Sequence, residues 1–316
     1  MSSRVVIVDP FESPGIAELA DLSGVPWVRV RAWPFEVEAH DRVVTSVPVP
    51  SGARGRALGV VTGVPAAAAP DEAWPDLTVM LSENRAEILA HMSGANAPPS
   101  PRVGVMGMRG GIGVTYLAAC IARTLAHHPL TVALVSDDPH SPLPEWTKSR
   151  DAWSQIELDG PILPQRLSET LPMWRRARLM AGRCPAKGVA TAVAASLSRF
   201  HDVVVEDRGR LTRSADADGL DALVVVYSGE RCDLDLWERV SHGIAVPVIA
   251  VARTHPTGTV VTPADIADFL GTQVIVFPHE KGARLAPAHG GEPGDRTRGS
   301  GAKVAGGIVG QILEYL

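Results

Sequence analysis

The chain has 316 residues and a mass of 33.4 kDa, which is enough for two domains with a sizeable core. Its net charge is −5, 45% of its residues are hydrophobic and its mean hydropathy is +0.08, which excludes a disordered acidic chain, a strongly basic nucleic-acid coat and a multispan membrane protein. Three widely spaced cysteines indicate neither a disulfide framework nor a zinc site. Because no signal-peptide core and no run of about 18 apolar residues occurs, we expect a cytoplasmic protein.

The first part of the chain, residues 1–92, has the pattern of a small α/β domain. Segments Ile16–Leu22 and Glu83–Met92 have helical patterns, and the Ala/Pro-rich stretch Val64–Pro75 is typical of a loop. Residues 93–102, rich in proline, serine and glycine, predict a linker. The predicted strands are Arg4–Val8, Trp27–Val30, Arg42–Val47, Leu58–Thr62 and Leu77–Leu81.

Residues 103–316 predict a second α/β domain, because nearly continuous Val, Ile and Leu runs alternate with segments of helical length. Runs without polar alternation are typical of strands covered on both faces, so we expect a mostly parallel sheet wrapped by helices. The predicted strands are Val103–Met106, Thr131–Val135, Asp202–Val205, Ala222–Tyr227, Val246–Ala252 and Gln273–Val276. The predicted helices are Thr115–Leu125, Ala190–Ser198, Asp233–Ser241, Pro263–Leu270 and Lys303–Leu316.

The segment Val103–Ala118, VGVMGMRGGIGVTYLA, carries the strongest functional signal, because a buried strand runs through four glycines into a helix. Glycines at such a turn let backbone N–H groups face inward and join the helix N-terminus in binding phosphate oxygens. The sequence therefore predicts a phosphate site, with a merely tight connection as the plainer alternative.

Two nucleotide-site patterns fit this loop. The spacing Gly107-x-x-x-Gly111-x-Gly113, followed by Asp137 after the next strand, is that of short-chain dehydrogenases. Those enzymes also need a Tyr-x-x-x-Lys pair for proton transfer, and no lysine in this chain follows a tyrosine at that spacing. An NADP-binding oxidoreductase therefore stays only a distant alternative.

The other pattern is a P-loop. The segment Arg109–Tyr116, RGGIGVTY, resembles the K-G-G-x-G-K-[ST]-[ST] motif of the MinD/ParA superfamily of ATPases. The resemblance implies that Arg109 holds the position that reaches a partner's nucleotide across a dimer, that Thr115 binds Mg²⁺, and that Val114 replaces the phosphate-binding lysine. The residues that the motif assigns to ATP are Gly110, Gly111, Gly113, Val114, Thr115 and Tyr116.

Later segments carry the same resemblance in the same order. Asp138, in Ser136-Asp137-Asp138-Pro139, matches the acid that positions the attacking water, and Asp207 matches the acid that supports Mg²⁺. Arg208-Gly209-Arg210 replaces the usual Thr-Pro-Pro, and Arg253 stands at the base-recognition position that is normally asparagine. The resemblance covers about two thirds of the chain.

The substitution at Val114 decides what activity to expect. One hydrogen bond to a charged group is worth about 1.5–3 kcal/mol, so its loss weakens nucleotide binding by roughly 10- to 150-fold. Hydrolysis suffers more, because phosphoryl transfer depends on positioning and charge stabilisation. We therefore expect weak binding of ATP and Mg²⁺ with very weak or no ATPase activity.

The layout, with a P-loop-free N-terminal domain before a MinD-like domain, resembles the CpaE/TadZ proteins and actinobacterial septum-site-determining proteins. It implies a positioning or scaffolding role with protein partners in cell division or in a Tad pilus or secretion machine. The alternative is an active ATP-driven homodimeric switch. The N-terminal domain resembles a response-regulator receiver, with Asp9 in the acidic pocket, but no aspartate ends the third strand, so phosphorylation is not expected.

Three further features have plain interpretations. Met173–Arg178, MWRRAR, is read as a solvated helix face. The alternative is a DNA-binding patch formed together with Arg208, Arg210 and Arg213, which the negative net charge disfavours. Neighbouring His127 and His128 point apart on a helix and are not expected to bind a metal. Lys303–Leu316 carries one lysine and suits packing better than peripheral contact with an anionic membrane.

Overall fold

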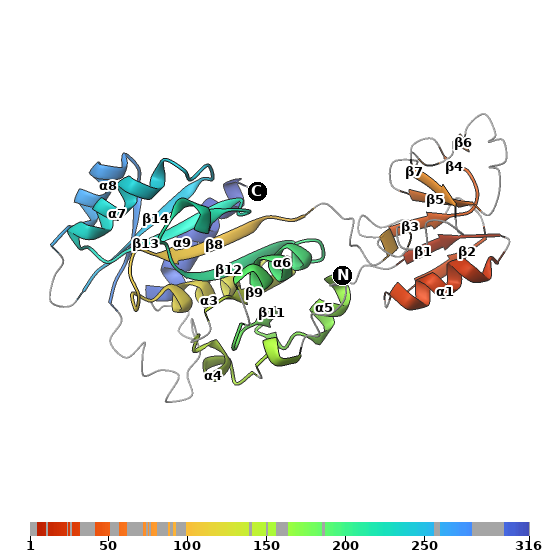
Figure 1. Cartoon of the computed structure of the whole chain (residues 1–316), viewed down its shortest axis with the longest axis horizontal. Helices are drawn as coiled ribbons and strands as arrows, with labels where there is room; N and C mark the ends of the chain where they lie inside the picture. The colour runs from red at the N-terminus through yellow and green to blue at the C-terminus, as the bar shows by residue number, and fades with distance from the viewer. Residues whose placement is uncertain are drawn as a thin grey trace. The chain divides into compact units, whose positions relative to one another are not determined.

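The computed structural model divides the chain into two compact units, Met1–Pro98 with Pro161–Leu167, and Pro99–Gly160 with Ser168–Leu316 (Figure 1). The residues that the structure describes are 5–10, 12–23, 25, 27–31, 42–50, 57–61, 72–73, 75, 77–80, 88, 91–92, 99–138, 141–149, 151–155, 164–184, 187–255, 260–279 and 300–315.

The first unit contains a five-stranded parallel sheet in the order β2-β1-β3-β5-β7, and helix α1 (Pro14–Ser23) follows its first strand. This is the flavodoxin-like order of doubly wound sheets. Asp9 lies at the end of β1, fully buried, where it accepts a 2.8 Å hydrogen bond from Ser46 Oγ. The strands are β1 (Val5–Val8), β2 (Trp27–Val30), β3 (Arg42–Thr45), β5 (Ala57–Val61) and β7 (Leu77–Met80).

The structure describes parts of two segments of this unit for which the sequence predicted a loop and a helix. The stretch Val64–Pro75 was expected to be loop throughout, but it contains the two-residue strand β6 (Glu72–Ala73), paired antiparallel with β4 (Val49–Pro50). A pair this short has no recognisable alternation in sequence. Of the predicted helix Glu83–Met92, residues 88, 91 and 92 are helical and the others lie outside the described residues.

The second unit is built on an eight-stranded sheet in the order β10-β11-β9-β12-β8-β13-β14-β15, parallel except for β10 with β11. The mostly parallel sheet that the sequence predicted is therefore confirmed. The strands are β8 (Arg102–Gly107), β9 (Val132–Ser136), β10 (Met173–Trp174), β11 (Ala177–Met180), β12 (Val203–Arg210), β13 (Ala222–Tyr227), β14 (Val248–Arg253) and β15 (Val274–Phe277).

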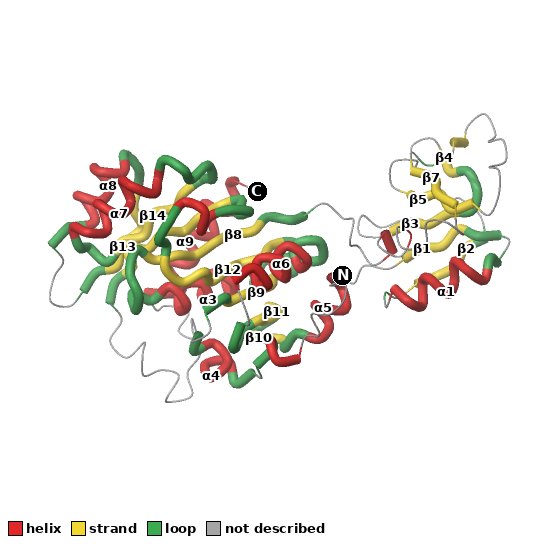
Figure 2. The backbone as a smooth tube through the Cα atoms, in the orientation of Figure 1, coloured by secondary structure: helices red, strands yellow, loops and turns green. Residues whose placement is uncertain are grey.

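Helices flank this sheet on both faces (Figure 2). They are α3 (Val114–Leu125), α4 (Leu143–Thr147), α6 (Lys187–Leu197), α7 (Arg231–Ser241), α8 (Pro263–Leu270) and α9 (Ser300–Tyr315). The residues of α5 (Pro164–Thr170) are divided between the two units. Strand β13 shows why the sequence had no polar alternation. Its residues Val224 and Val226 face the core formed with α3 and α9, whereas Val225 and Tyr227 face the core formed with α7 and α8.

The segment Met173–Arg178 corrects the expectation of a helix face. It forms the β10–β11 hairpin, in which Trp174 pairs with Ala177 across a two-residue turn. The turn residues Arg175 and Arg176 both have positive φ, 47° and 72°. Turns of this kind normally use asparagine or glycine, so two arginines gave no turn signal in the sequence.

Helix α9 closes the second unit by packing against α3. Ile308, Val309 and Ile312 are buried in the same core as α3, which confirms a packing role for this segment. Within the described part of the chain, no helix has both the length and the apolar character needed to cross a membrane.

Candidate functional site

The glycine loop lies between β8 and α3, at the middle of the large sheet. Gly111 and Gly113 have φ of 76° and 96°, in the left-handed region where glycine is favoured. A Cβ atom at Gly110 or Gly111 would meet no heavy atom within 4 Å. The loop therefore presents its backbone to open space, as close approach of an anion requires.

The first turn of α3 faces the same space. Gly113 is its N-cap residue and no side chain caps the helix. The first N–H groups of a helix lack intrahelical acceptors and carry partial positive charge. These amides, together with the loop, form a site suited to phosphate oxygens.

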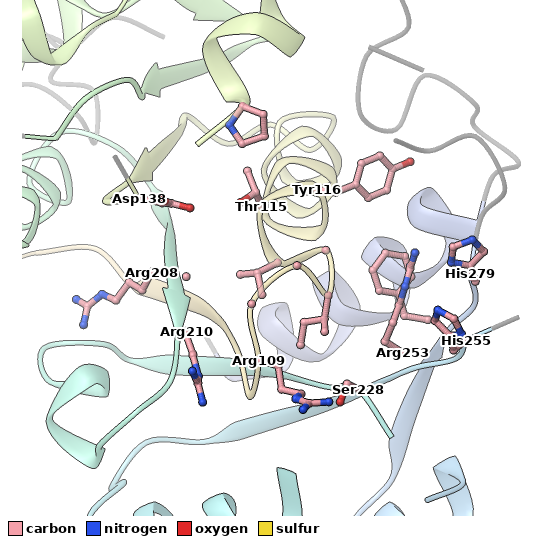
Figure 3. A pocket seen from close by; sticks show the side chains of 18 of the residues that line it. Arg109, Thr115, Tyr116, Asp138, Arg208, Arg210, Ser228, Arg253, His255 and His279 are labelled. Atoms are coloured by element: carbon pink, nitrogen blue, oxygen red, sulfur yellow. The ribbon is translucent and has the colours of Figure 1, made fainter. Parts of the chain in front are cut away.

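A cavity of about 1010 Å³ opens over the loop (Figure 3). All the residues that the sequence assigned to ATP line it, as do Arg109, Asp138 and Arg253. Asp207 lies beneath it, fully buried, and does not line it. Asp137, which only the dehydrogenase pattern used, also lines the cavity. The lining residues that sequence reasoning did not assign to a nucleotide site are Ile112, Pro142, Trp146, Arg208, Gly209, Arg210, Ser228, His255, Phe277 and His279.

The two residues predicted to support Mg²⁺ are brought together. The side chain of Thr115 hydrogen-bonds Asp207, and Ser136 Oγ donates a second bond of 3.1 Å to Asp207 Oδ2. Burial raises the pKa of Asp207 to about 6, an effect that these two hydrogen bonds oppose. The negative charges of the neighbouring Asp137 and Asp138 contribute to the same rise. A divalent cation beside Thr115 would relieve this accumulation of negative charge.

Val114 occupies the lysine position of the motif, and its side chain belongs to the core. It is 7% exposed and packs with the buried residues of α3 and β8. A Cβ added to Gly107 would come within 2.7 Å of Val114 Cγ2, so the side chain fits closely against the end of β8. Val114 therefore brings no charged group to the cavity that it lines, and the described residues that line the cavity include no lysine.

The two residues predicted to act in catalysis lie at different parts of the loop. Asp138 is half-buried after β9, near Thr115 and Asp207. Arg109 is half-exposed at the tip of the loop and forms an ion pair with Glu230 of its own chain, with 3.9 Å between Nη1 and Oε1. A pair at this exposure is weak, so Arg109 is able to exchange Glu230 for an anion.

An aromatic wall, formed by Tyr116, Trp146 and Phe277, borders the cavity. The Tyr116 ring stacks on that of Phe277 with centroids 6.4 Å apart, and meets Trp146 edge-on at 6.3 Å. The guanidinium of Arg253 lies over Phe277, 4.0 Å from the ring centroid, and donates a 3.1 Å hydrogen bond to the carbonyl of Pro278. This wall offers flat surfaces on which a planar base could stack.

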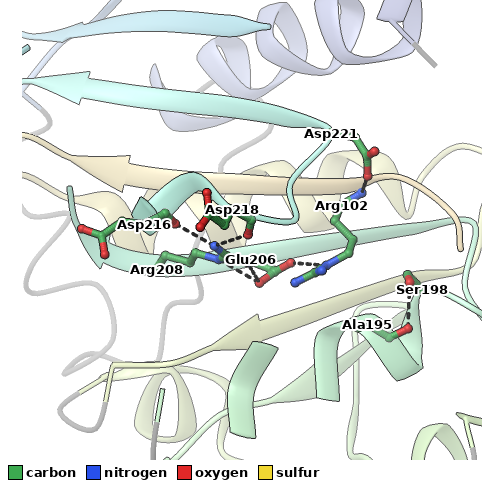
Figure 4. A network of polar contacts seen from close by, with 8 residues as sticks. All are labelled: Arg102, Ala195, Ser198, Glu206, Arg208, Asp216, Asp218 and Asp221. Atoms are coloured by element: carbon green, nitrogen blue, oxygen red, sulfur yellow. Dashed lines mark hydrogen bonds and ion pairs between the residues drawn. The ribbon is translucent and has the colours of Figure 1, made fainter. Parts of the chain in front are cut away.

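Beside the cavity, Arg208 is part of a buried charged network (Figure 4). Glu206 accepts a 2.7 Å bond from Arg102 Nε and a 3.0 Å bond from Arg208 Nε. Arg208 Nη1 also donates to the carbonyls of Asp216 and Asp218, at 2.7 and 3.1 Å. The guanidinium of Arg208 is therefore engaged in the fold, although the residue borders the cavity.

The described residues, those of the cavity included, contain no group of three or more His, Cys, Asp or Glu side chains that could hold a metal ion. His127 and His128 lie in a turn directly after α3, and not on a helix as the sequence analysis expected. The three cysteines are free, with Cys120 and Cys184 buried and Cys232 exposed.

No family model matches the sequence, and no curated protein matches it. Among solved structures, MinD of Aquifex aeolicus is similar, with a TM-score of 0.55, 15% identity, and coverage of 68% of this chain and 97% of that one. A ParA family ATPase from Chlorobium tepidum has a TM-score of 0.53 and 14% identity, covering 67% of this chain and 98% of its own.

The chain contains a MinD/ParA fold. A third similar structure, the septum site-determining protein MinD from Pyrococcus horikoshii with Mg-ADP, has a TM-score of 0.50 and 13% identity, covering 69% of this chain and 99% of its own. The MinD/ParA fold expected from the glycine loop and the ordered acidic landmarks is thus confirmed. At these identities the comparisons establish the fold alone.

Proposed function

We propose that the MinD/ParA fold of this chain binds a nucleoside di- or triphosphate with Mg²⁺ at the glycine loop. The observation that carries this proposal is the contact of Thr115 with Asp207, directly beneath a loop whose glycines leave open space above their backbone. When bound, Mg²⁺ would supply positive charge to the phosphates. In this chain Thr115 would hold the ion directly and Asp207 would support it from below.

The residues present fit such a ligand in two respects and depart in one. The glycine loop with the α3 amides suits phosphates, and the aromatic wall with Arg253 suits a base. The departure is Val114, which leaves the motif without its ammonium group. Because hydrolysis depends on that charge more than binding does, we infer weak binding with very slow or no turnover.

A protein that binds a nucleotide but hydrolyses it very slowly would act by binding other proteins. We infer a positioning or scaffolding role of the MinD/CpaE type, in septum placement or in locating a Tad-like pilus or secretion machine. The similar structures support a role in positioning more than any one machine. MinD of Pyrococcus horikoshii is called septum site-determining, and MinD of Aquifex aeolicus is also found in a complex with MinC. The partners of this chain would be proteins of such a machine, a second copy included.

The second candidate is an active dimeric ATPase switch. The observation that favours it is Arg109, which stands half-exposed at the loop tip with only a weak ion pair to Glu230. In that role Arg109 would reach a partner's nucleotide and Asp138 would position water.

Calorimetric titration of the whole chain with Mg-ATP and Mg-ADP, paired with a phosphate-release assay, separates these functions. Binding with release no faster than a protein-free control supports the scaffold, and release clearly above that control supports the switch. The Thr115→Val variant keeps the size of the side chain and should lose the Mg²⁺-dependent part of binding. Absence of any nucleotide binding would refute the proposal, and a response to NADP alone would favour the dehydrogenase pattern.

A further inference from the structure

Strand β12 ends in an irregularity, and Arg210, the residue that follows it, lines the cavity. Asp207 pairs with Val105 of β8, but Arg210 pairs with Gly107, so one extra residue is inserted between these two pairs. Gly209 has φ of 68°, in the left-handed region. Bulges of this kind redirect side chains next to functional sites. Here the bulge places Arg210 opposite the first glycine of the loop.

Arg210 differs from the other arginines that line the cavity in what its guanidinium contacts. Arg208 is buried on Glu206, Arg109 pairs with Glu230, and Arg253 binds the carbonyl of Pro278. Arg210 is exposed on the cavity wall, and no described acidic side chain forms an ion pair with it. In Figure 3 the side chain of Arg208 extends away from the loop, whereas those of Arg109 and Arg210 lie at its tip.

We propose that Arg210 supplies the phosphate-binding cation that Val114 removed from the glycine loop. The inference rests on the proposed function, because it assumes a phosphate ligand in this cavity. The side chain of Val114 is buried in the core and carries no charge. An arginine at the end of β12 can supply the positive charge that the motif's lysine would otherwise give to the phosphates. The charge is restored from a neighbouring strand.

The replacement changes what the site recognises. A guanidinium presents a planar fork that binds two oxygens of a phosphate at once, whereas an ammonium is a compact point charge. Arg210 and Arg109 together would hold the outer phosphates, beyond the one that the loop amides bind. The site is therefore selective for nucleotides with two or more phosphates over monophosphates.

The test is calorimetric titration of the full chain and its Arg210→Ala variant with Mg-ATP. Loss of a hydrogen-bonded charge predicts affinity roughly 10- to 150-fold weaker. Arg239→Ala removes the same charge from an exposed position on α7 outside the cavity, and should bind within about twofold of the parent chain. Equal thermal unfolding temperatures for both variants show that the fold is kept.

AMP is the second probe, because it lacks the outer phosphates. Arg210→Ala should leave the affinity for AMP unchanged while the affinity for ATP falls. Equal ATP affinity in the parent and Arg210→Ala chains would overturn the inference and leave the proposed function standing, and so would an equal loss for AMP and ATP. A parent chain that binds no nucleotide would instead refute both.

Discussion

The side chains of Arg102 and Glu206 form a buried ion pair, with 2.7 Å between Nε and Oε1. Glu206 binds Arg208 with its other oxygen, so one carboxylate pairs with two guanidinium groups. Removing one partner of a buried pair leaves uncompensated charge, which is far more costly than losing an exposed pair. This network therefore ties the start of β8 to the residues that follow Asp207.

The first prediction concerns this network. Glu206→Ala should lower the free energy of unfolding by about 3–5 kcal/mol, because Arg102 and Arg208 would stay buried without their carboxylate. Glu238→Ala, at an exposed position on α7, should change it by about 0.5 kcal/mol or less. Urea unfolding of the three chains measures both. Similar values for the two variants would mean that the network is open to water.

The second prediction concerns the lysine position. Val114→Lys should cost about 1–3 kcal/mol of stability without ligand, because a longer side chain enters a packed core. In a chain that also carries Arg210→Ala, it should strengthen Mg-ATP binding by roughly 10- to 150-fold, because the lysine returns a charge to the phosphate site. Val114→Met is the control, with comparable length and no charge, and should show only the loss of stability. A lysine variant that binds no better than the methionine variant contradicts an otherwise intact phosphate loop.

The third prediction concerns acid stability. His201 is buried with 3.0 Å between its Nε2 and Ser168 Oγ, and burial, helped by the positive charge of Arg178, lowers its pKa to about 4. The unfolded chain binds this proton near pH 6.5, so the histidine's contribution to stability is lost as pH falls from about 6.5 through 4. The loss approaches about 3 kcal/mol.

Comparing His201→Gln with the parent chain isolates this contribution, since the other acid-sensitive groups are shared. Denaturant unfolding at pH 7 and pH 4.5 should show a smaller decrease in stability for His201→Gln. His242→Gln, exposed after α7, should behave as the parent chain does. An equal decrease in stability in all three chains would show that the fold does not lower the pKa of His201.

The fourth prediction concerns the closing helix. Ile312 is fully buried against the core of α3, whereas its neighbour Leu313 is 39% exposed. Ile312→Ala should lower stability by about 2–5 kcal/mol, and Leu313→Ala by about 0.5 kcal/mol or less. Thermal or urea unfolding tests the difference. Comparable small effects would indicate that α9 is only loosely attached.

The parallel sheet and the glycine loop were predictable because their signals are local. Strands such as Ala222–Tyr227 are continuous apolar runs, and the glycines before Thr115 lie together in sequence. The pairing of Thr115 with Asp207 was implied only by resemblance, and the structure supplies the contact itself.

Other features depended on contacts between distant segments. The hairpin at Arg175 and Arg176 uses residues that seldom adopt positive φ, so its turn was invisible in the sequence. The bulge at Gly209 depends on register with β8, and the placement of Trp146 on the aromatic wall carried no periodic or motif signal. The cavity was therefore predictable at its floor, where one loop forms it, and not at its walls, where separate strands and helices meet.

The last helix, α9, leaves room for one ring of the aromatic wall. A Cβ atom at Gly301, in the first turn of α9, would come within 2.7 Å of Tyr116 Cε1. The missing side chain at Gly301 thus provides the space in which the tyrosine ring stands parallel to Phe277. A residue of the last helix therefore fixes where one aromatic ring of the cavity stands, and even a methyl group at position 301 would require Tyr116 to move.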